Sequence, residues 1–169
     1  MNIDQVHSLS QIKVRHIHKE TFTVMGIETF GCNQNNEIPN LWRRFLINMN
    51  QLSHYHNNTF LCICDHVPDY DPNKSEFSYM ACIEIGNTKF HPPKGMITKT
   101  IFKQDYVVFT HVGHSDMLED TYKYIYGTYF FKSEFELENA PDFELYDSRF
   151  NPNSERSEID IYIPVKSIS

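Results

Sequence analysis

The chain has 169 residues, which suits one domain with a sizeable core, and its 40% hydrophobic and 22% charged residues are ordinary for a globular protein. Its net charge of −7, from 22 acidic and 15 basic residues, argues against a nucleic-acid-binding groove and favours cationic partners. Aromatic residues reach 14%, a surplus that fits a thick sheet core or an aromatic-lined pocket.

The amino terminus carries no apolar run of the kind that a signal peptide needs. No stretch approaches the roughly 18 consecutive apolar residues of a membrane-spanning helix. We therefore expect a cytoplasmic protein without a membrane partner. Its cysteines are then expected to be reduced thiols, and they are Cys32, Cys62, Cys64 and Cys82.

The first half of the chain predicts a β-α-β-β arrangement. Residues 11–31 are rich in apolar and β-branched side chains and predict one long strand or a bent pair. Pro39 suits the first turn of a helix, and apolar residues then recur at helical spacing up to Met49. Residues 60–65 and 77–85 predict two further strands, which a Pro-rich link at residues 68–74 joins into a hairpin.

The second half repeats this order. Residues 98–112 predict a strand, and Ser115-Asp116 provides an N-cap for a helix. The apolar face of that helix is formed by Leu118, Tyr122, Ile125, Tyr126 and Tyr129. Two alternating stretches, around 143–146 and 159–163, then predict a closing antiparallel hairpin.

The two halves match at a constant offset of 82 positions, which places Gly31 on Gly113 and Asp65 on Asp147. The sequence therefore predicts a single α+β domain over residues 1–169, with duplicated β-α-β-β halves at about 1–90 and 96–169. We expect a pseudo-twofold axis between the halves and an antiparallel sheet with the helices on one face.

The closing hairpin predicts what lies on each face of that sheet. Its aliphatic face, with Ile159, Ile161 and Ile163, is expected to face the helices. Its other face is expected to carry acids and tyrosines and to line a groove between the halves. The residues expected there are Glu144, Tyr146, Asp160 and Tyr162, joined across the groove by Cys62, Cys64, Ser78 and Met80 through the repeat.

Several segments together resemble the GyrI-like small-molecule (effector) binding family, which also forms the C-terminal ligand domain of AraC-type and MerR-type multidrug-responsive regulators. The matching segments are residues 106–113, 122–129, 141–147 and 159–165, with a looser match around Trp42 and residues 77–85. The resemblance implies a ligand cleft between duplicated halves. No DNA-binding segment precedes the match, so the chain resembles the free-standing members.

The resemblance implies that Glu144 faces cationic, aromatic ligands in the cleft. The pattern alone favours the alternative that Glu144 is an ordinary solvent-facing strand residue. The candidate walls of the cleft are Tyr146, Tyr162, Tyr129, Tyr79 and Trp42. Tyr146 and Tyr162 are alternatively cross-strand neighbours that stabilise the hairpin, Tyr79 maps onto the core residue Ile161, and Tyr129 and Trp42 lie on helical apolar faces that are typical of a core.

The cysteines raise the alternative of a metal site. Cys62 and Cys64 share one strand face and Cys82 lies on the neighbouring strand, but the spacing is not that of a zinc knuckle. We expect these thiols to be core or pocket wall, and we expect no metal and no cofactor. The sequence also contains no nucleophile elbow, phosphate loop or dinucleotide fingerprint.

The sequence thus predicts a stand-alone protein that binds small cationic or amphipathic aromatic molecules, linked to transcription regulation or drug response, without direct nucleic-acid contact. One alternative is a small hydrolase that uses Glu144, because a cleft carboxylate beside a tyrosine can serve in acid–base catalysis. Another is a protein-interaction module with a protein partner, such as an inhibitor of DNA gyrase.

Overall fold

The computed structural model describes residues 12–55, 58–66, 77–86 and 91–167, so the expected link at 68–74 lies outside the described residues. The elements in chain order are β1 (Lys13–Lys19), β2 (Phe22–Gly31), α2 (Glu37–Ile47), β3 (Phe60–His66), β4 (Phe77–Ile85), β5 (Ile97–Ile101), β6 (Gln104–Val112), α3 (Leu118–Tyr124), α4 (Phe130–Lys132), β7 (Asp142–Tyr146) and β8 (Glu158–Val165). A π-helical turn, Ile125–Tyr129, joins α3 to α4. Within the described ranges, no helix combines the length and apolar character needed to cross a bilayer.

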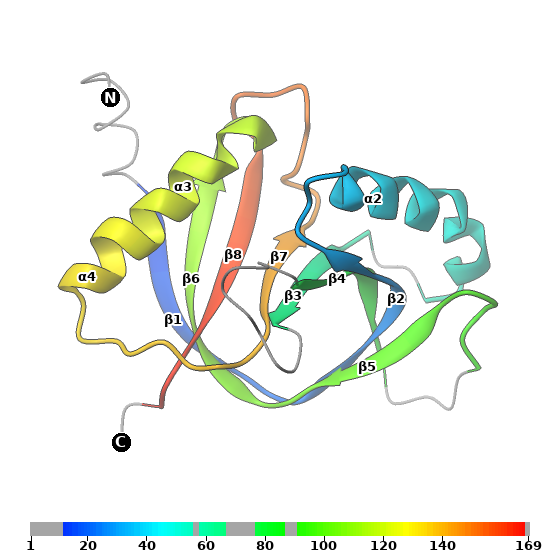
Figure 1. Ribbon diagram of the computed structural model, residues 1–169, viewed down its shortest axis with the longest axis horizontal. Coiled ribbons are helices and arrows are strands. Elements are labelled where there is room, and N and C mark those ends of the chain that lie inside the picture. The colour runs from blue at the N-terminus through cyan, green and yellow to red at the C-terminus, as the bar shows by residue number, and fades with distance from the viewer. Residues whose placement is uncertain (1–11, 56–57, 67–76, 87–90, 168–169) are drawn as a thin grey trace.

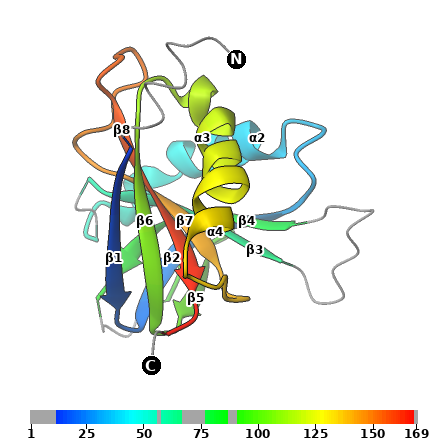
Figure 2. The ribbon, with the colours of Figure 1, turned by 90° about the vertical axis from the view of Figure 1, so that its left-hand side faces the viewer.

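The strands form one eight-stranded antiparallel sheet in the order β1-β6-β8-β7-β3-β4-β2-β5. Figure 1 shows β7 and β3 in the middle of this sheet, with α3 on one side of them and α2 on the other. Figure 2, turned by 90°, shows β1, β6 and β8 side by side at one end. The α+β architecture predicted from the sequence is therefore confirmed.

The strand order also carries the duplication. If β1, β2, β3 and β4 are exchanged with β5, β6, β7 and β8, the order reads the same from the opposite end. The pseudo-twofold axis consequently passes between the central strands β3 and β7. Near the crossing of the two halves, Thr21 Oγ1 accepts a hydrogen bond of 3.0 Å from the backbone N–H of Lys103, its equivalent 82 positions later.

Each half has one strand more than the β-α-β-β prediction. The predicted single strand 98–112 is wrong, because the chain breaks at Phe102 and Lys103 into β5 and β6. In the first half, residues 13–31 form β1 and β2, which is the bent pair predicted as one of the two alternatives for that stretch. Both short strands pair with the opposite half, β1 with β6 and β5 with β2, and so link the two halves at both ends of the sheet.

The offset of 82 positions does not hold in the last strand. Leu61 pairs with Cys82, and the equivalent pair in the second half is Phe143 with Tyr162. Phe143 lies 82 positions after Leu61, whereas Tyr162 lies only 80 positions after Cys82. The offset in β8 is therefore two residues shorter than in the rest of the repeat. Because two is an even number, each residue of β8 still faces the same side of the sheet as its equivalent in β4, but that equivalent lies two positions away from the one that the offset of 82 predicts.

The predicted faces of the closing hairpin need a correction. Glu144 lies opposite Ile161, and Phe143 lies opposite Tyr162. Directly opposed residues in an antiparallel pair project from the same face. Glu144 and Tyr146 therefore share the helix-bearing face with the isoleucines, and Tyr162 lies on the other face. The alternation of side chains shows which residues of one strand share a face. Which residues of two neighbouring strands share a face depends on the register in which the strands pair.

The helix-bearing face has two hydrophobic clusters, one under each helix. Leu41 and Phe45 lie four residues apart on α2, so they share one side of the helix and are both buried against β2 and β4. On the other half, Phe109 and Ile161 pack beneath Ile125 of the π-helical turn. The helices thus cover the outer strand pairs, while the central strands β3 and β7 lie between them.

The opposite face is packed as a core, contrary to the prediction that it holds the ligand groove. The buried residues there are Phe22, Val24, Leu61, Ile63, Met80, Cys82, Ile101, Tyr106, Val108, Phe143 and Tyr162. Asp160, predicted for the groove, is buried on this face. Its Oδ2 lies 2.8 Å from guanidinium nitrogens of both Arg15 and Arg149, so its charge is already neutralised.

Candidate ligand-binding cleft

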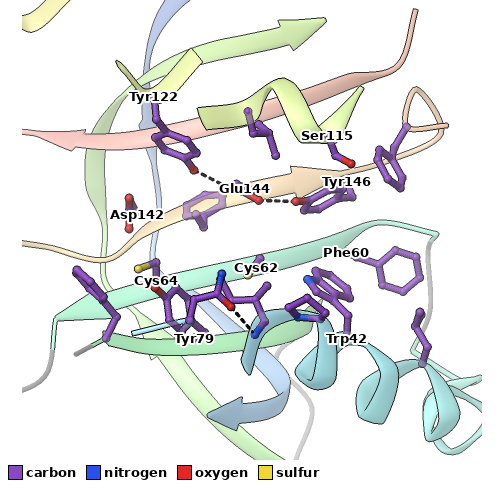
Figure 3. A pocket seen from close by; sticks show the side chains of 18 of the residues that line it. Trp42, Phe60, Cys62, Cys64, Tyr79, Ser115, Tyr122, Asp142, Glu144 and Tyr146 are labelled. Atoms are coloured by element: carbon purple, nitrogen blue, oxygen red, sulfur yellow. Dashed lines mark hydrogen bonds between the residues drawn. The ribbon is translucent and has the colours of Figure 1, made fainter. Parts of the chain in front are cut away.

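A cavity of about 970 Å³ opens on the helix-bearing face between α2 and α3. Its floor is formed by the central strands β3 and β7, as Figure 3 shows. The lining residues are Asn33, Ile38, Pro39, Trp42, Leu46, Phe60, Cys62, Cys64, Phe77, Tyr79, Ser115, Leu118, Tyr122, Tyr126, Asp142, Phe143, Glu144, Tyr146 and Phe150. The cavity therefore spans the pseudo-twofold axis and takes walls from both halves.

The cleft follows from where the helices sit. Residues at alternate positions of β3 and β7 project towards the helix side, and they include Cys62, Cys64, Glu144 and Tyr146. Because α2 packs on β2 and β4, and the second helical segment packs over β6 and β8, these side chains are not covered from above. The uncovered surface of β3 and β7 between the two helices therefore forms a groove between the halves, as predicted.

Glu144 is held in the cleft by two tyrosines. Tyr122 donates its hydroxyl to Glu144 Oε1 at 2.6 Å, and Tyr146 donates to Oε2. The ion pairs formed among the described residues include none to Glu144. The carboxylate thus has hydrogen-bond donors that orient it, but no cationic side chain of the described residues neutralises it.

The tyrosines that hold Glu144 remain neutral near physiological pH. Burial raises the pKa of the Tyr122 and Tyr146 hydroxyls well above the ordinary value, and the adjacent Glu144 carboxylate adds to the rise in both cases. Each phenol therefore keeps its proton and serves as a donor to the carboxylate.

Asp142 is a second carboxyl group on the same wall. It is two residues before Glu144 on β7 and lies opposite Cys64 of β3. Burial raises the pKa of Asp142 to about 7, and the nearby carboxylates of Glu144 and Asp65 act in the same direction. Since its ordinary value is 3.8, Asp142 is a group whose charge changes near neutral pH.

Aromatic rings form the walls at both ends of the cleft. The ring of Trp42 meets that of Tyr146 edge to face at 5.5 Å, and Tyr146 meets Phe150 in the same way at 5.0 Å. From α3 and the turn after it, Tyr122 and Tyr126 stack with ring centroids 6.4 Å apart. Flat rings beside unneutralised carboxylates suit a flat or bulky organic cation.

The structure brings four of the six predicted site residues to the cleft: Glu144, Tyr146, Tyr79 and Trp42. Tyr162 lies elsewhere, on the opposite face of the sheet, where it stacks on Phe143 with centroids 4.3 Å apart. Tyr129 also lies outside the cleft lining, because it packs edge to face on Phe109 at 4.8 Å in the core under α3.

Sequence reasoning missed Asp142, Tyr122, Tyr126 and Phe60 as lining residues. Asp142 could have been predicted from the sequence. It lies two residues before Glu144 on the same strand, and residues two apart on a strand project from the same face. Tyr122 and Tyr126 are spaced by four and were assigned together to a helical core face, but they lie at the edge of that face and contact the cleft.

All four cysteines are free thiols, and three of them, Cys62, Cys64 and Cys82, lie on strands of the sheet. Cys62 and Cys64 line the cleft, whereas Cys82 is buried in the core of the opposite face. Burial raises the pKa of the Cys62 and Cys64 thiols, so both are protonated at neutral pH. The described part of the chain contains no cluster of three or more His, Cys, Asp or Glu side chains arranged for a metal ion.

A duplicated antiparallel sheet with an aromatic cleft between two helices defines a small-molecule-binding domain. The chain belongs to the GyrI-like small molecule binding domain family, whose model matches residues 12–166.

Known proteins of this architecture include transcription regulators. The chain is 30% identical over 165 residues to the transcriptional regulator BrlR of Pseudomonas aeruginosa, a match that covers 94% of this chain and 59% of BrlR. Among solved structures, SAV2435 bound to tetraphenylphosphonium has a TM-score of 0.74 at 20% identity and covers 91% of this chain and 94% of its own. The C-terminal domain of EcmrR has a TM-score of 0.68 at 14% identity, with coverages of 94% and 99%. At these identities, the two structures show the shared fold.

Proposed function

We propose that this protein binds small, aromatic organic cations in the cleft between its halves, with Glu144 as the principal negative charge. The observation that carries the proposal is the state of Glu144. Two tyrosine hydroxyls orient its carboxylate, aromatic rings surround it, and no ion pair among the described residues neutralises it.

The physical reason is the cost of leaving such a charge without a counterion. A partly buried carboxylate loses part of its hydration, and two hydroxyl donors replace only some of it. An incoming cation restores favourable electrostatics, while its flat or bulky apolar body covers the rings of Trp42 and Tyr146. SAV2435, which shares the fold, is bound to tetraphenylphosphonium, a cation of this kind.

The binding is proposed to serve regulation. The chain matches a part of BrlR that amounts to 59% of that regulator, and the C-terminal domain of EcmrR has the same fold. On this proposal, a bound cation changes how the domain associates with a transcription regulator or another protein partner. A pull-down from lysate with and without the cation tests this step, and identical captured proteins under both conditions would argue against it.

Calorimetry with a pair of matched probes tests the binding itself. Tetraphenylphosphonium and tetraphenylborate have the same shape and opposite charge, so only the cation is expected to bind. Glu144→Gln keeps the size of the side chain and removes its charge, and should weaken the cation by about 1.5–3 kcal/mol, the range of a charge-assisted contact.

Glu84→Gln is the matched control, because Glu84 is an exposed strand glutamate outside the cleft that pairs with Lys19 at 3.2 Å. This variant should bind the cation as the wild type does. Equal binding of cation and anion, or equal affinity of wild type and Glu144→Gln, would remove Glu144 from the proposed role.

A further inference from the structure

The two carboxyl groups of the cleft differ in their hydrogen bonds. Both oxygens of Glu144 accept a tyrosine hydroxyl, from Tyr122 and from Tyr146. Asp142 is contacted by its own backbone N–H and by the thiol of Cys64, which is a weak donor. A carboxylate has about four lone-pair sites, so both groups retain acceptor capacity, but Asp142 receives no tyrosine hydroxyl like the two that hold Glu144.

Their positions also differ. Asp142 and Glu144 are two residues apart on one strand face, which corresponds to about 6.6 Å along the strand. Figure 3 shows Asp142 at one end of the cleft, near Cys64 and Tyr122, with Glu144 further along the wall and Tyr146 and Trp42 beyond it. The cleft therefore has carboxyl groups at two separate positions along its length.

Among the described residues of the lining, no base compensates the second carboxyl group. The residues of the described ranges that line the cavity include no Lys, Arg or His. Among the described residues, the ion pairs of basic side chains involve other acids, such as Asp160, Glu28 and Asp105. Two carboxyl groups close together in a partly desolvated cavity repel each other unless a proton or a ligand cation lies between them.

We infer that Asp142 forms a second cation subsite that accepts hydrogen bonds from N–H-bearing cationic groups, so that the cleft favours aromatic cations with an ammonium, amidinium or guanidinium end. This rests on the proposed binding of organic cations beside Glu144. Glu144 acts on a diffuse positive charge through its own charge, whereas Asp142 adds directional N–H···O bonds, which are the stronger class when both partners are charged.

Two cationic probes separate the subsites. Tetraphenylphosphonium is a monocation without N–H groups, and pentamidine is an aromatic molecule with an amidinium at each end. Calorimetry is carried out with the wild type, Asp142→Asn and Glu144→Gln. Asp142→Asn should weaken pentamidine by about tenfold or more and change tetraphenylphosphonium by less than about twofold, while Glu144→Gln should weaken both.

Asp116→Asn is the matched control, because Asp116 is exposed and outside the cavity lining, and it should leave both affinities unchanged. Asp142→Ser, which removes the charge with a smaller side chain, repeats the test if the asparagine variant unfolds. Equal weakening of both probes by the Asp142 variants, or no effect on pentamidine, overturns the subsite.

The outcome distinguishes this inference from the proposed function. If tetraphenylphosphonium binds and depends on Glu144, but pentamidine is indifferent to Asp142, the subsite alone is wrong. If neither probe binds the wild type, or if Glu144→Gln affects neither, the proposed function fails, whatever the Asp142 variants do.

Discussion

Tyr146 donates its hydroxyl to the carboxylate of Glu144, two residues earlier on the same strand and the same face. A second donor, Tyr122, reaches the other carboxylate oxygen from α3 at 2.6 Å. Glu144 thus joins the central strand β7 to the helix that covers the neighbouring strands. The same contacts hold the Glu144 carboxylate in one orientation, which would reduce the ordering cost of the proposed cation binding.

Removing one of these donors should weaken both stability and cation binding. Tyr146→Phe deletes a hydrogen bond to a charged acceptor, so we expect the free energy of unfolding to fall by about 1–2 kcal/mol. Urea denaturation measures the change, and tetraphenylphosphonium affinity should fall by a few fold. Tyr126→Phe is the control, because the hydroxyl of Tyr126 makes no side-chain hydrogen bond with the part of the chain that the structure describes.

A double-mutant cycle of Tyr146→Phe with Glu144→Gln should isolate the pair. Residues in direct contact typically couple by about 0.5–3 kcal/mol. We expect the double variant to lose less stability than the sum of the single losses, as measured by urea denaturation. Strict additivity would mean that the Glu144–Tyr146 contact does not contribute to the folded state.

Stability should decline as pH rises from about 4 to about 7, through Asp142. Its pKa is about 7 in the folded protein against an ordinary value of 3.8, so the folded state binds more protons than the unfolded state in this window. The neutral carboxyl group therefore contributes fully to the free energy of unfolding below pH 3.8, and this contribution is lost as the pH rises past about 7. Denaturation at a series of pH values measures it.

Asp142→Asn should remove this part of the pH dependence. Near pH 8 the variant should be more stable than the wild type by about 1–3 kcal/mol, since one pKa unit corresponds to about 1.4 kcal/mol, and near pH 4 the two should be similar. Asp116→Asn should follow the wild-type curve, because that side chain is exposed. A variant that is less stable than the wild type at both pH values would contradict the assignment.

Binding of pentamidine, an N–H-bearing cation, should release protons near pH 7. A cation beside Asp142 favours its charged form and so lowers the pKa of Asp142 from about 7. Calorimetric enthalpies in buffers of different ionisation enthalpy reveal the released protons. The release should disappear in Asp142→Asn and persist in Asp116→Asn; a release that is unchanged in Asp142→Asn would place the titrating group elsewhere.

The cleft thiols should report on occupancy. Burial raises the pKa of Cys64, so its reaction with iodoacetamide should be slow at pH 8, and a bound cation that covers the wall should slow it further. Mass spectrometry of the modified peptides measures the rates. Cys82, buried in the core of the opposite face, should show no dependence on the cation; protection of Cys82 with no effect on Cys64 would argue against a ligand in this cleft.

The sequence already carried the alternation of β7, and with it the shared face of Glu144 and Tyr146, because side chains in a strand point to opposite sides in turn. The repeat with its offset of 82 predicted the two halves and the groove between them. The same reasoning could have predicted Asp142 as a cleft residue, because it lies two residues before Glu144 and so projects from the same face. Trp42 and Tyr79 lie in the cleft although their periodicity also suited a core.

Only the tertiary structure decided which residues of different strands share a face. The register of β7 on β8 sets Phe143, and not Glu144, beside Tyr162, which places Tyr162 in the opposite core. The crossing of β1 and β5 into the other half, and the packing of Tyr129 on Phe109, depend in the same way on contacts between distant segments. The local sequence pattern determines which residues of one strand share a face, but the register between strands is fixed by the burial of side chains across the whole sheet.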